Sequence, residues 1–173
     1  MKYDPRRHHR RSIRLRNYDY AQPGAYFITI DLKNCRRHFA SCPELKRIVE
    51  EEWENISKRY PNVKLGVHVI MPDHFHGIIV IVGATLAVAQ GKNRVGARPT
   101  PTGIKTKPTL GDIVGSFKSL CFYRWFQYVR KNKINAPVKF WQRNYYEHVI
   151  RNDREFQVIR EYIINNPVRG YSD

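Results

Sequence analysis

The chain carries two apolar runs, residues 63–70 (VKLGVHVI) and residues 74–82 (HFHGIIVIV), which are joined by a short turn at residues 71–73 (MPD). Both runs are rich in the β-branched residues that favour strands, and a proline followed by an acid is typical of a turn. The pattern therefore predicts an antiparallel hairpin.

The segments before this hairpin predict one strand and one helix. Residues 26–32 are β-branched and aromatic, and they follow a Gln-Pro-Gly turn at residues 22–24, so a first strand is expected there. Residues 43–59 begin with a proline suited to a first helical turn and carry apolar side chains at helical spacing, which predicts the first helix.

The segments after the hairpin are predominantly helical in pattern. Residues 110–129 predict a second amphipathic helix and residues 153–165 a third. We expect Pro167 to stop the third helix, because the residue before a proline is disfavoured in the helical region. Between these helices, residues 138–141 predict a short extended piece and residues 144–151 a turn or short helix.

This order of elements predicts a single α+β domain over residues 1–173. We expect an antiparallel sheet with helices packed on one face, in a ferredoxin-like or split arrangement. Residues 1–16 form a basic N-terminal arm, and residues 83–109, rich in Gly, Ala, Thr and Pro, form a flexible insert loop. Three cysteines without a Cys-x-x-Cys pair, Cys35, Cys42 and Cys121, are expected to be free thiols.

The chain is strongly basic, with 31 Lys+Arg against 15 Asp+Glu, a net charge of +16. Residues 17–82 hold eight of each sign, so the excess lies in the arm (+6), the insert loop (+5) and residues 117–173 (+6). An apolar content of 42% is enough for a core and argues against a disordered basic tail protein. The expected partner is a polyanion, a nucleic acid first and an anionic membrane surface second. No apolar run approaches the roughly 20 residues of a membrane span, and no segment predicts a basic amphipathic helix, so a membrane partner is not expected. A cytoplasmic location follows as an expectation.

His74 and His76 open the second strand of the hairpin and are the sharpest chemical signal. Strand alternation places both imidazoles on one face with Phe75 on the other, so two nitrogens can converge on a metal or a phosphate. A third ligand must come from elsewhere. The competing interpretation is a pair of polar residues facing solvent at a strand end, and the lone His68 is interpreted as structural or surface.

Tyr162 and Asn166 are four residues apart on the third predicted helix, so the phenol and the carboxamide lie on one side of it. A tyrosine phenol can attack a phosphodiester if a divalent cation draws charge from a phosphate oxygen. His74, His76 and the Asn166 carbonyl are candidate ligands of that cation. The competing interpretation is that Tyr162 is an ordinary core tyrosine.

Residues 140–151 (FWQRNYYEHVIR) interleave aromatic and basic side chains. Aromatic faces stack on unpaired bases while arginine holds phosphates, so this pattern favours single-stranded nucleic acid, although a packed aromatic turn has the same composition. The candidate DNA-binding residues, including those of the N-terminal arm, are Arg6, Arg7, Arg10, Arg11, Arg14, Lys118, Trp141, Arg143, Tyr145, His148 and Arg151.

Taken together, these segments resemble the HUH-type single-tyrosine transposases, and among them the REP-associated tyrosine transposases (transposase IS200-like). The resemblance covers nearly the whole chain, and its specificity lies in the order and spacing of the motifs. They are residues 3–15 (YDPRRHHRRSIRL), 26–30 (YFITI), 69–79 (VIMPDHFHGII), 115–119 (GSFKS), 141–151 (WQRNYYEHVIR) and 162–168 (YIINNPV).

The resemblance implies a ferredoxin-like HUH endonuclease fold and roles for individual residues. His74 and His76 correspond to the metal ligands, Tyr162 in the Tyr-Ile-x-x-Asn-Pro motif to the nucleophile, and Asn166 to an assisting ligand. The implied cofactor is Mg²⁺ or Mn²⁺. The implied reaction is cleavage and rejoining of single-stranded DNA at hairpin-forming repetitive extragenic palindromes, through a 5′-phosphotyrosine and a free 3′-hydroxyl.

Two segments depart from the family pattern. Residues 40–44 are shorter than in many relatives, and residues 83–109 carry no expected catalytic part. The resemblance also implies a bacterial, nucleoid-associated location in the cytoplasm, and it leaves a homodimer and a monomer both open. The alternative function is a non-catalytic regulator of the same fold that binds DNA or RNA hairpins.

Overall fold

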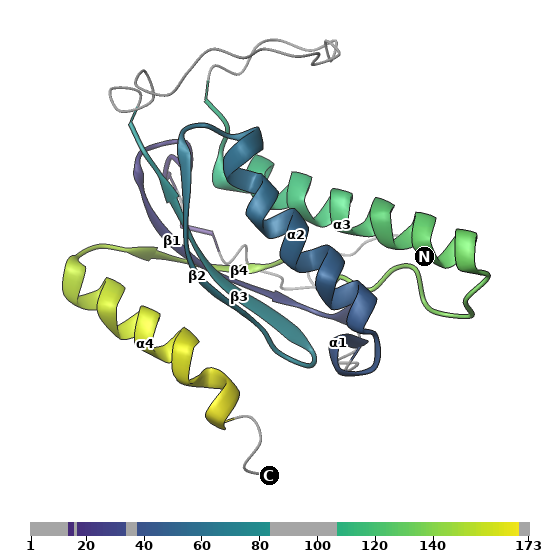
Figure 1. The fold of residues 1–173 in the computed structure, drawn as a ribbon. Helices are drawn as coiled ribbons and strands as arrows, with labels where there is room; N and C mark the ends of the chain where they lie inside the picture. Colours follow the sequence, from purple (N-terminus) through teal and green to yellow (C-terminus); the bar gives the residue numbers. More distant parts are fainter. Residues whose placement is uncertain (1–13, 16, 34–37, 84–106, 170–173) are drawn as a thin grey trace, which may run out of the picture.

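The computed structural model describes residues 14–15, 17–33, 38–83 and 107–169 of the chain (Figure 1). The predicted DNA contacts Arg6, Arg7, Arg10 and Arg11, most of the predicted insert loop and Cys35 lie outside the described residues. The elements, in chain order, are β1 (Gly24–Asp31), α1 (His38–Ser41), α2 (Pro43–Arg59), β2 (Val63–Ile70), β3 (His74–Ile81), α3 (Leu110–Asn132), β4 (Tyr146–Ile150) and α4 (Asp153–Arg169).

The four strands form one antiparallel sheet in the order β2-β3-β1-β4. The predicted hairpin is confirmed as β2 and β3, and β1 lies beside β3 with Ile28 opposite Gly77. The α+β class with an antiparallel sheet is therefore as predicted, and the helix predicted at residues 43–59 is α2, with the same bounds. The short helix α1 before it was not predicted. None of the helices in the described part of the chain is long and apolar enough to cross a membrane.

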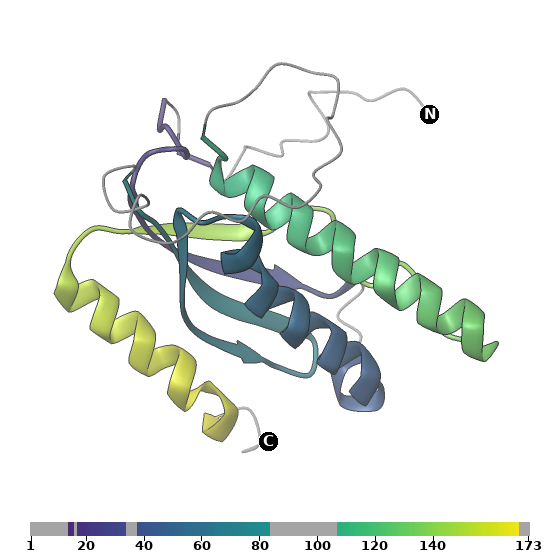
Figure 2. The same cartoon turned by 45° about the horizontal axis from the view of Figure 1, so that its top comes forward.

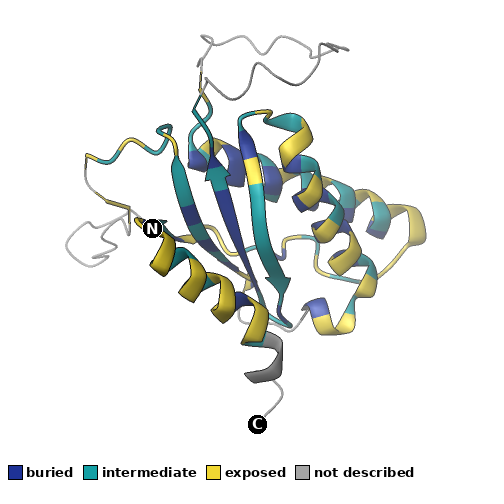
Figure 3. Ribbon diagram, turned by 60° about the vertical axis from the view of Figure 1, so that its left-hand side comes forward, coloured by how far each residue is buried: buried dark blue, intermediate teal, exposed yellow. Residues whose placement is uncertain are grey.

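The helices cover both faces of the sheet, so the prediction of a single covered face is wrong. Figures 1 and 2 show α2 and α3 side by side on one face and α4 on the opposite face. The reason is that β1 and β3 are apolar on both sides. Ile28 and Phe75 belong to the core under α2 and α3, whereas Ile78 packs with Ile150 and Ile163 under α4. Figure 3 shows the buried residues between these layers.

Two other local predictions need correction. Residues 144–151 contain the strand β4 and not a turn or short helix, because pairing with β1 from Ala25↔Ile150 to Thr29↔Tyr146 supplies their hydrogen-bond partners. The helix α4 continues to Arg169, so Pro167 does not stop it. A proline there removes only one backbone bond near the helix end. The extended piece predicted at residues 138–141 reduces to a bridge between Leu32 and Trp141.

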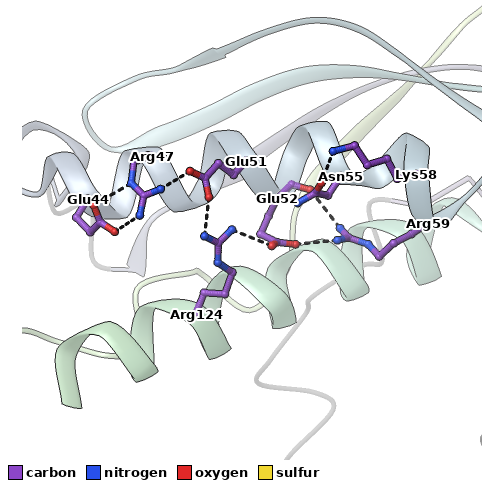
Figure 4. Close-up of polar contacts among 8 residues, drawn as sticks. All are labelled: Glu44, Arg47, Glu51, Glu52, Asn55, Lys58, Arg59 and Arg124. Atoms are coloured by element: carbon purple, nitrogen blue, oxygen red, sulfur yellow. Dashed lines mark hydrogen bonds and ion pairs between the residues drawn. The ribbon is translucent and has the colours of Figure 1, made fainter. Parts of the chain in front are cut away.

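The helices α2 and α3 are joined by an ion-pair network centred on Arg124 (Figure 4). Its guanidinium donates to Glu51 and, over 3.0 Å, to Glu52, which also accepts from Arg59 over 2.8 Å. Glu52 is buried, and a buried carboxylate needs such partners. Two acids of the neutral part of the chain, Glu51 and Glu52, thus join α2 to α3. Of the cysteines, Cys42 and Cys121 are free, as predicted.

Candidate active site

The sheet face beneath α4 carries the two histidines of β3. Cross-strand pairing places Thr29 opposite His76 and Asp31 opposite His74. The predicted placement of both imidazoles on one face is confirmed, since their ring centroids lie 4.5 Å apart. Two imidazole nitrogens are therefore side by side at one end of the hairpin.

His76 is held on both ring nitrogens. Its Nδ1 lies 2.8 Å from the Thr29 hydroxyl, and its Nε2 lies 3.5 Å from the phenol oxygen of Tyr162. The side chain is buried, and burial, with a smaller effect of His74, lowers the pKa of His76 to about 4. The imidazole is therefore neutral at pH 7 and keeps a nitrogen lone pair, which a metal ligand requires.

His74 is oriented by the acid that precedes it. Its Nδ1 lies 2.6 Å from a carboxylate oxygen of Asp73, which can only accept, so Nδ1 carries the proton of this bond. The Nε2 of a neutral His74 is then the nitrogen with a free lone pair. A carboxylate behind a histidine is the usual arrangement that fixes the tautomer of a metal-binding imidazole.

Tyr162 comes to this face because α4 packs on it. Ile163 is fully buried in the cluster with Ile78, and the Tyr162 ring meets Phe27 edge-on at a centroid distance of 6.2 Å. Tyr162 itself is 45% exposed. Its phenol is thus open to a substrate on one side while lying beside His76 on the other.

The start of α4 is fixed by polar contacts with β4. Asn152 accepts from the backbone N–H of Glu155, and the Glu155 carboxylate contacts His148 Nε2 at 2.6 Å and accepts from the Arg151 backbone N–H over 2.7 Å. His148 and Arg151, both predicted DNA contacts, therefore lie at the β4–α4 junction. The imidazole of His148 is engaged with Glu155, whereas the side chain of Arg151 is exposed.

Asn166 lies one helical turn after Tyr162. Its amide nitrogen is buried and has no hydrogen-bond partner among the described residues. A half-turn about the Cβ–Cγ bond exchanges the amide nitrogen and oxygen, so an unpartnered carboxamide at this position can offer a carbonyl oxygen to a cation.

The donor set fits a divalent cation of the predicted kind. Two imidazole nitrogens with an oxygen ligand are compatible with Mn²⁺, and less so with Mg²⁺, which prefers oxygen. Within residues 14–15, 17–33, 38–83 and 107–169, no three His, Cys, Asp or Glu side chains converge to hold a metal. A protein ligand beyond the two histidines would therefore be of another type, such as the Asn166 amide.

The other predicted DNA contacts lie away from this face. Arg14 donates to the Tyr145 phenol over 3.1 Å and lies 3.5 Å from a carboxylate oxygen of the buried Glu147. Burial and the nearby Glu147 raise the pKa of Tyr145, so the phenol stays neutral. The remaining three, Lys118, Trp141 and Arg143, line one pocket beside α3.

Sequence reasoning missed Thr29 and Asp73. Asp73 was visible as the acid directly before His74, in the turn of the hairpin. Thr29 gave no local signal, because its place opposite His76 depends on the register between β1 and β3.

Comparisons with known proteins find a relative in sequence and a likeness in fold. No family model matches the chain. An uncharacterized protein of Haemophilus influenzae is 40% identical over 179 residues, covering 99% of this chain and 96% of that protein. The structure of a REP-associated tyrosine transposase bound to a REP hairpin superimposes with a TM-score of 0.55 and 19% identity, over 91% of this chain and 74% of that one. The second likeness is one of fold.

Proposed function

We propose that this chain, which belongs to the same family as the uncharacterized protein of Haemophilus influenzae, is a metal-dependent single-stranded DNA endonuclease and strand transferase. Tyr162 is the proposed nucleophile, and His74 and His76, assisted by Asn166, are the proposed ligands of Mg²⁺ or Mn²⁺. The observation that carries this proposal is the 3.5 Å separation between the Tyr162 phenol oxygen and His76 Nε2, with His74 beside them.

In the proposed reaction, the phenolate oxygen of Tyr162 attacks the phosphorus of a DNA phosphodiester. A bond forms between that oxygen and phosphorus, the bond from phosphorus to the 3′-oxygen breaks, and the 3′-oxygen takes up a proton. The 5′-phosphate remains on Tyr162, so the energy of the ester is kept and a 3′-hydroxyl can reverse the step. A divalent cation held by His74 and His76, assisted by Asn166, would stabilise the negative charge that develops on the phosphate oxygens.

The protein side chains around this pair have positioning roles. Thr29 and Asp73 hold the two imidazoles in place through their Nδ1 atoms. Ile163 anchors α4 on the sheet, so that the phenol of the preceding residue stays beside His76. The exposed side of Tyr162 leaves room for a strand to approach.

Hairpin-forming repetitive extragenic palindromes are the proposed substrate. The solved transposase of similar fold was bound to a REP hairpin, and the +16 charge of this chain suits a polyanion. The basic excess lies in the N-terminal arm before β1, in the insert loop before α3 and in residues 117–173, and not in the neutral part of the chain from which β1, β2 and β3 come.

The test is covalent capture of DNA. Hairpin oligonucleotides taken from inverted repeats beside the gene, labelled at the 3′ end, are incubated with the chain and Mn²⁺ and separated on a denaturing gel. We expect a labelled protein band that EDTA and Tyr162→Phe abolish and that Tyr146→Phe, at a comparably exposed tyrosine, leaves intact. Salt-sensitive hairpin binding without any adduct, indifferent to Mn²⁺ and to His76→Ala, would instead identify the non-catalytic regulator.

A further inference from the structure

An open pocket of about 520 Å³ lies between α3 and residues 139–144, on the face of the sheet opposite α4. Its volume is within the range of sites that hold a small organic molecule. The catalytic arrangement around Tyr162 does not use it. Its lining is both cationic and aromatic, which favours a ligand that has an anionic group and a planar ring.

The cationic part of the lining comes from Lys33, Lys139 and Arg143, whose side chains are exposed. None of the described residues that line the pocket is acidic. An anion entering the pocket therefore meets positive charge without a competing carboxylate on its wall, which suits a phosphate group.

Lys118 also lines the pocket, but its ammonium group is bound to the backbone and is not one of the exposed cations. It donates to the carbonyl oxygens of Gln142 (2.6 Å), Arg143 (3.3 Å) and Asn144 (3.1 Å). An ammonium has three donors, so these three carbonyls account for them. Lys118 thus holds the loop that carries Arg143 at the pocket edge.

The aromatic part of the lining comes from Phe122 and Trp141. Phe122 is 36% exposed on the α3 side. Trp141 is half-buried and packs against Phe140 at 4.8 Å and Phe117 at 6.1 Å between ring centroids, so its position is fixed by the core. A fixed indole beside an exposed phenyl ring is a surface on which a planar base can stack.

The pocket is joined to the catalytic face through the end of β1. The Gln142 N–H donates to the Asp31 carbonyl over 2.9 Å, and Asp31 is paired with His74 on its other side. Neighbouring strands are about 4.8 Å apart, so the backbones of Gln142 and His74 are separated by two such spacings, roughly 10 Å. A single strand crossing this end of the sheet therefore has access to both places.

We propose that this pocket binds one unpaired nucleotide of the single-stranded segment beside the hairpin. The base stacks on Phe122 and Trp141, and the phosphate contacts Lys33, Lys139 and Arg143. This subsite rests on the proposed function for its substrate, but it is a binding site and does not depend on cleavage.

The test replaces each base of the strand flanking the hairpin, one at a time, with the fluorescent base 2-aminopurine, which stacking quenches. The protein carries Tyr162→Phe, so that binding is measured without covalent chemistry. We expect strong quenching at one position. Phe122→Ala should abolish that quenching and weaken strand binding about 5- to 150-fold, the equivalent of one lost base–aromatic stack. The control Tyr123→Ala alters a more exposed aromatic residue on the same helix that does not line the pocket and should change neither.

A second measurement tests the phosphate contacts. Because each contact to a single strand contributes about 0.7 to the slope of log affinity against log salt, Lys139→Ala should lower the magnitude of that slope by about this amount. Lys46→Ala, at an exposed lysine of α2, should leave it unchanged. Equal effects of the two lysine variants, or quenching unchanged by Phe122→Ala, would overturn the pocket assignment.

The outcomes separate this inference from the proposed function. If Phe122→Ala has no effect on binding while the wild-type chain still forms its Tyr162 adduct, the inference fails and the function stands. If quenching depends on Phe122 but no adduct ever forms, the function fails and the pocket stands. Thymidine 5′-monophosphate tests whether a free nucleotide is the ligand. If it displaces the DNA strand only at concentrations far above that of the strand, the assignment is supported. If it binds the protein more tightly than the strand does, the assignment is overturned.

Discussion

The phenol oxygen of Tyr162 lies 3.5 Å from Nε2 of His76, although the two residues are 86 positions apart in the chain. The contact exists because His76 faces α4 from β3 and because Ile163 buries the neighbouring side of that helix against Ile78. The sheet thus positions the proposed nitrogen ligand, and the helix positions the proposed nucleophile beside it.

Replacing Thr29 with valine tests whether His76 is held as a metal ligand. Thr29→Val keeps the shape but removes the hydroxyl that lies 2.8 Å from Nδ1, so the ring is no longer fixed in orientation and tautomer. We expect Mn²⁺ affinity, measured from the electron paramagnetic resonance signal of free Mn²⁺, to fall about 10- to 100-fold. Thr29→Ser should restore it, and equal affinity in the valine variant and the wild type would contradict this role.

His68 should make the fold sensitive to mild acid. Its ring lies beside those of Trp53 and Phe75, at centroid distances of 5.7 and 5.9 Å. Burial lowers the pKa of His68, although the nearby carboxylates of Glu50 and Glu54 on α2 act to raise it. Because the unfolded chain then binds the proton more readily, stability is lost as pH falls below the ordinary histidine pKa of about 6.5.

The corresponding measurement compares melting temperatures of the wild type and His68→Phe between pH 7.5 and pH 5. The phenyl ring keeps the aromatic contacts but cannot take up a proton. The wild type should lose more stability than the variant across this interval, and parallel curves would show that His68 does not titrate differently on folding.

Lys118 should matter for the order of the loop at residues 142–144. Lys118→Met keeps the length of the side chain but leaves three carbonyl oxygens without their donor. We expect the free energy of unfolding in urea to fall by about 1–3 kcal/mol. Lys46→Met, at an exposed position of α2, should change it by less than about 0.5 kcal/mol. A similar small change in both variants would contradict the loop-holding role.

Gly77 is required by close packing, and a second glycine provides the contrast. A Cβ at Gly77 would lie 2.6 Å from a ring carbon of Trp53, whereas a Cβ at Gly115, exposed on α3, has nothing within 4 Å. Gly77→Ala should therefore lower the free energy of unfolding by about 1–3 kcal/mol. Gly115→Ala should raise it by about 0.5–1 kcal/mol, because alanine favours a helix. Urea denaturation measures both free energies of unfolding. If Gly77→Ala is as stable as the wild type, the close packing of Gly77 against Trp53 is contradicted.

The parts of the fold that sequence predicted are those with a local pattern. The hairpin β2–β3 and the helix α2 follow from β-branched runs, a Pro-Asp turn and helical periodicity over adjacent residues. The strand β4 was not predicted, because its partner β1 lies more than a hundred residues earlier in the chain. In addition, Glu147 is a charged residue at a buried position of the strand, which breaks the expected pattern. Which face α4 covers is likewise a property of the assembled sheet and not of the order of elements.

The candidate site was predictable to a similar extent. Alternation placed His74 and His76 together, and helical spacing placed Tyr162 with Asn166, but only the packing of α4 on the sheet brings Tyr162 beside His76. For Lys118, the sequence suggested a role that the structure does not support directly. Its charge predicted a DNA contact, yet its ammonium donates to three carbonyls of its own chain, and no sequence pattern reveals that engagement.

Whether Tyr162 is the nucleophile is tested by locating the attached DNA by mass spectrometry after trypsin digestion of the Mn²⁺ reaction. Trypsin cleavage yields a peptide of residues 161–169, which contains Tyr162. It also yields a peptide of residues 144–151, which contains Tyr145 and Tyr146. The proposed function predicts the nucleotide mass on the first peptide, with fragments assigning it to Tyr162. Attachment to the second peptide, or to any residue other than Tyr162, would contradict it.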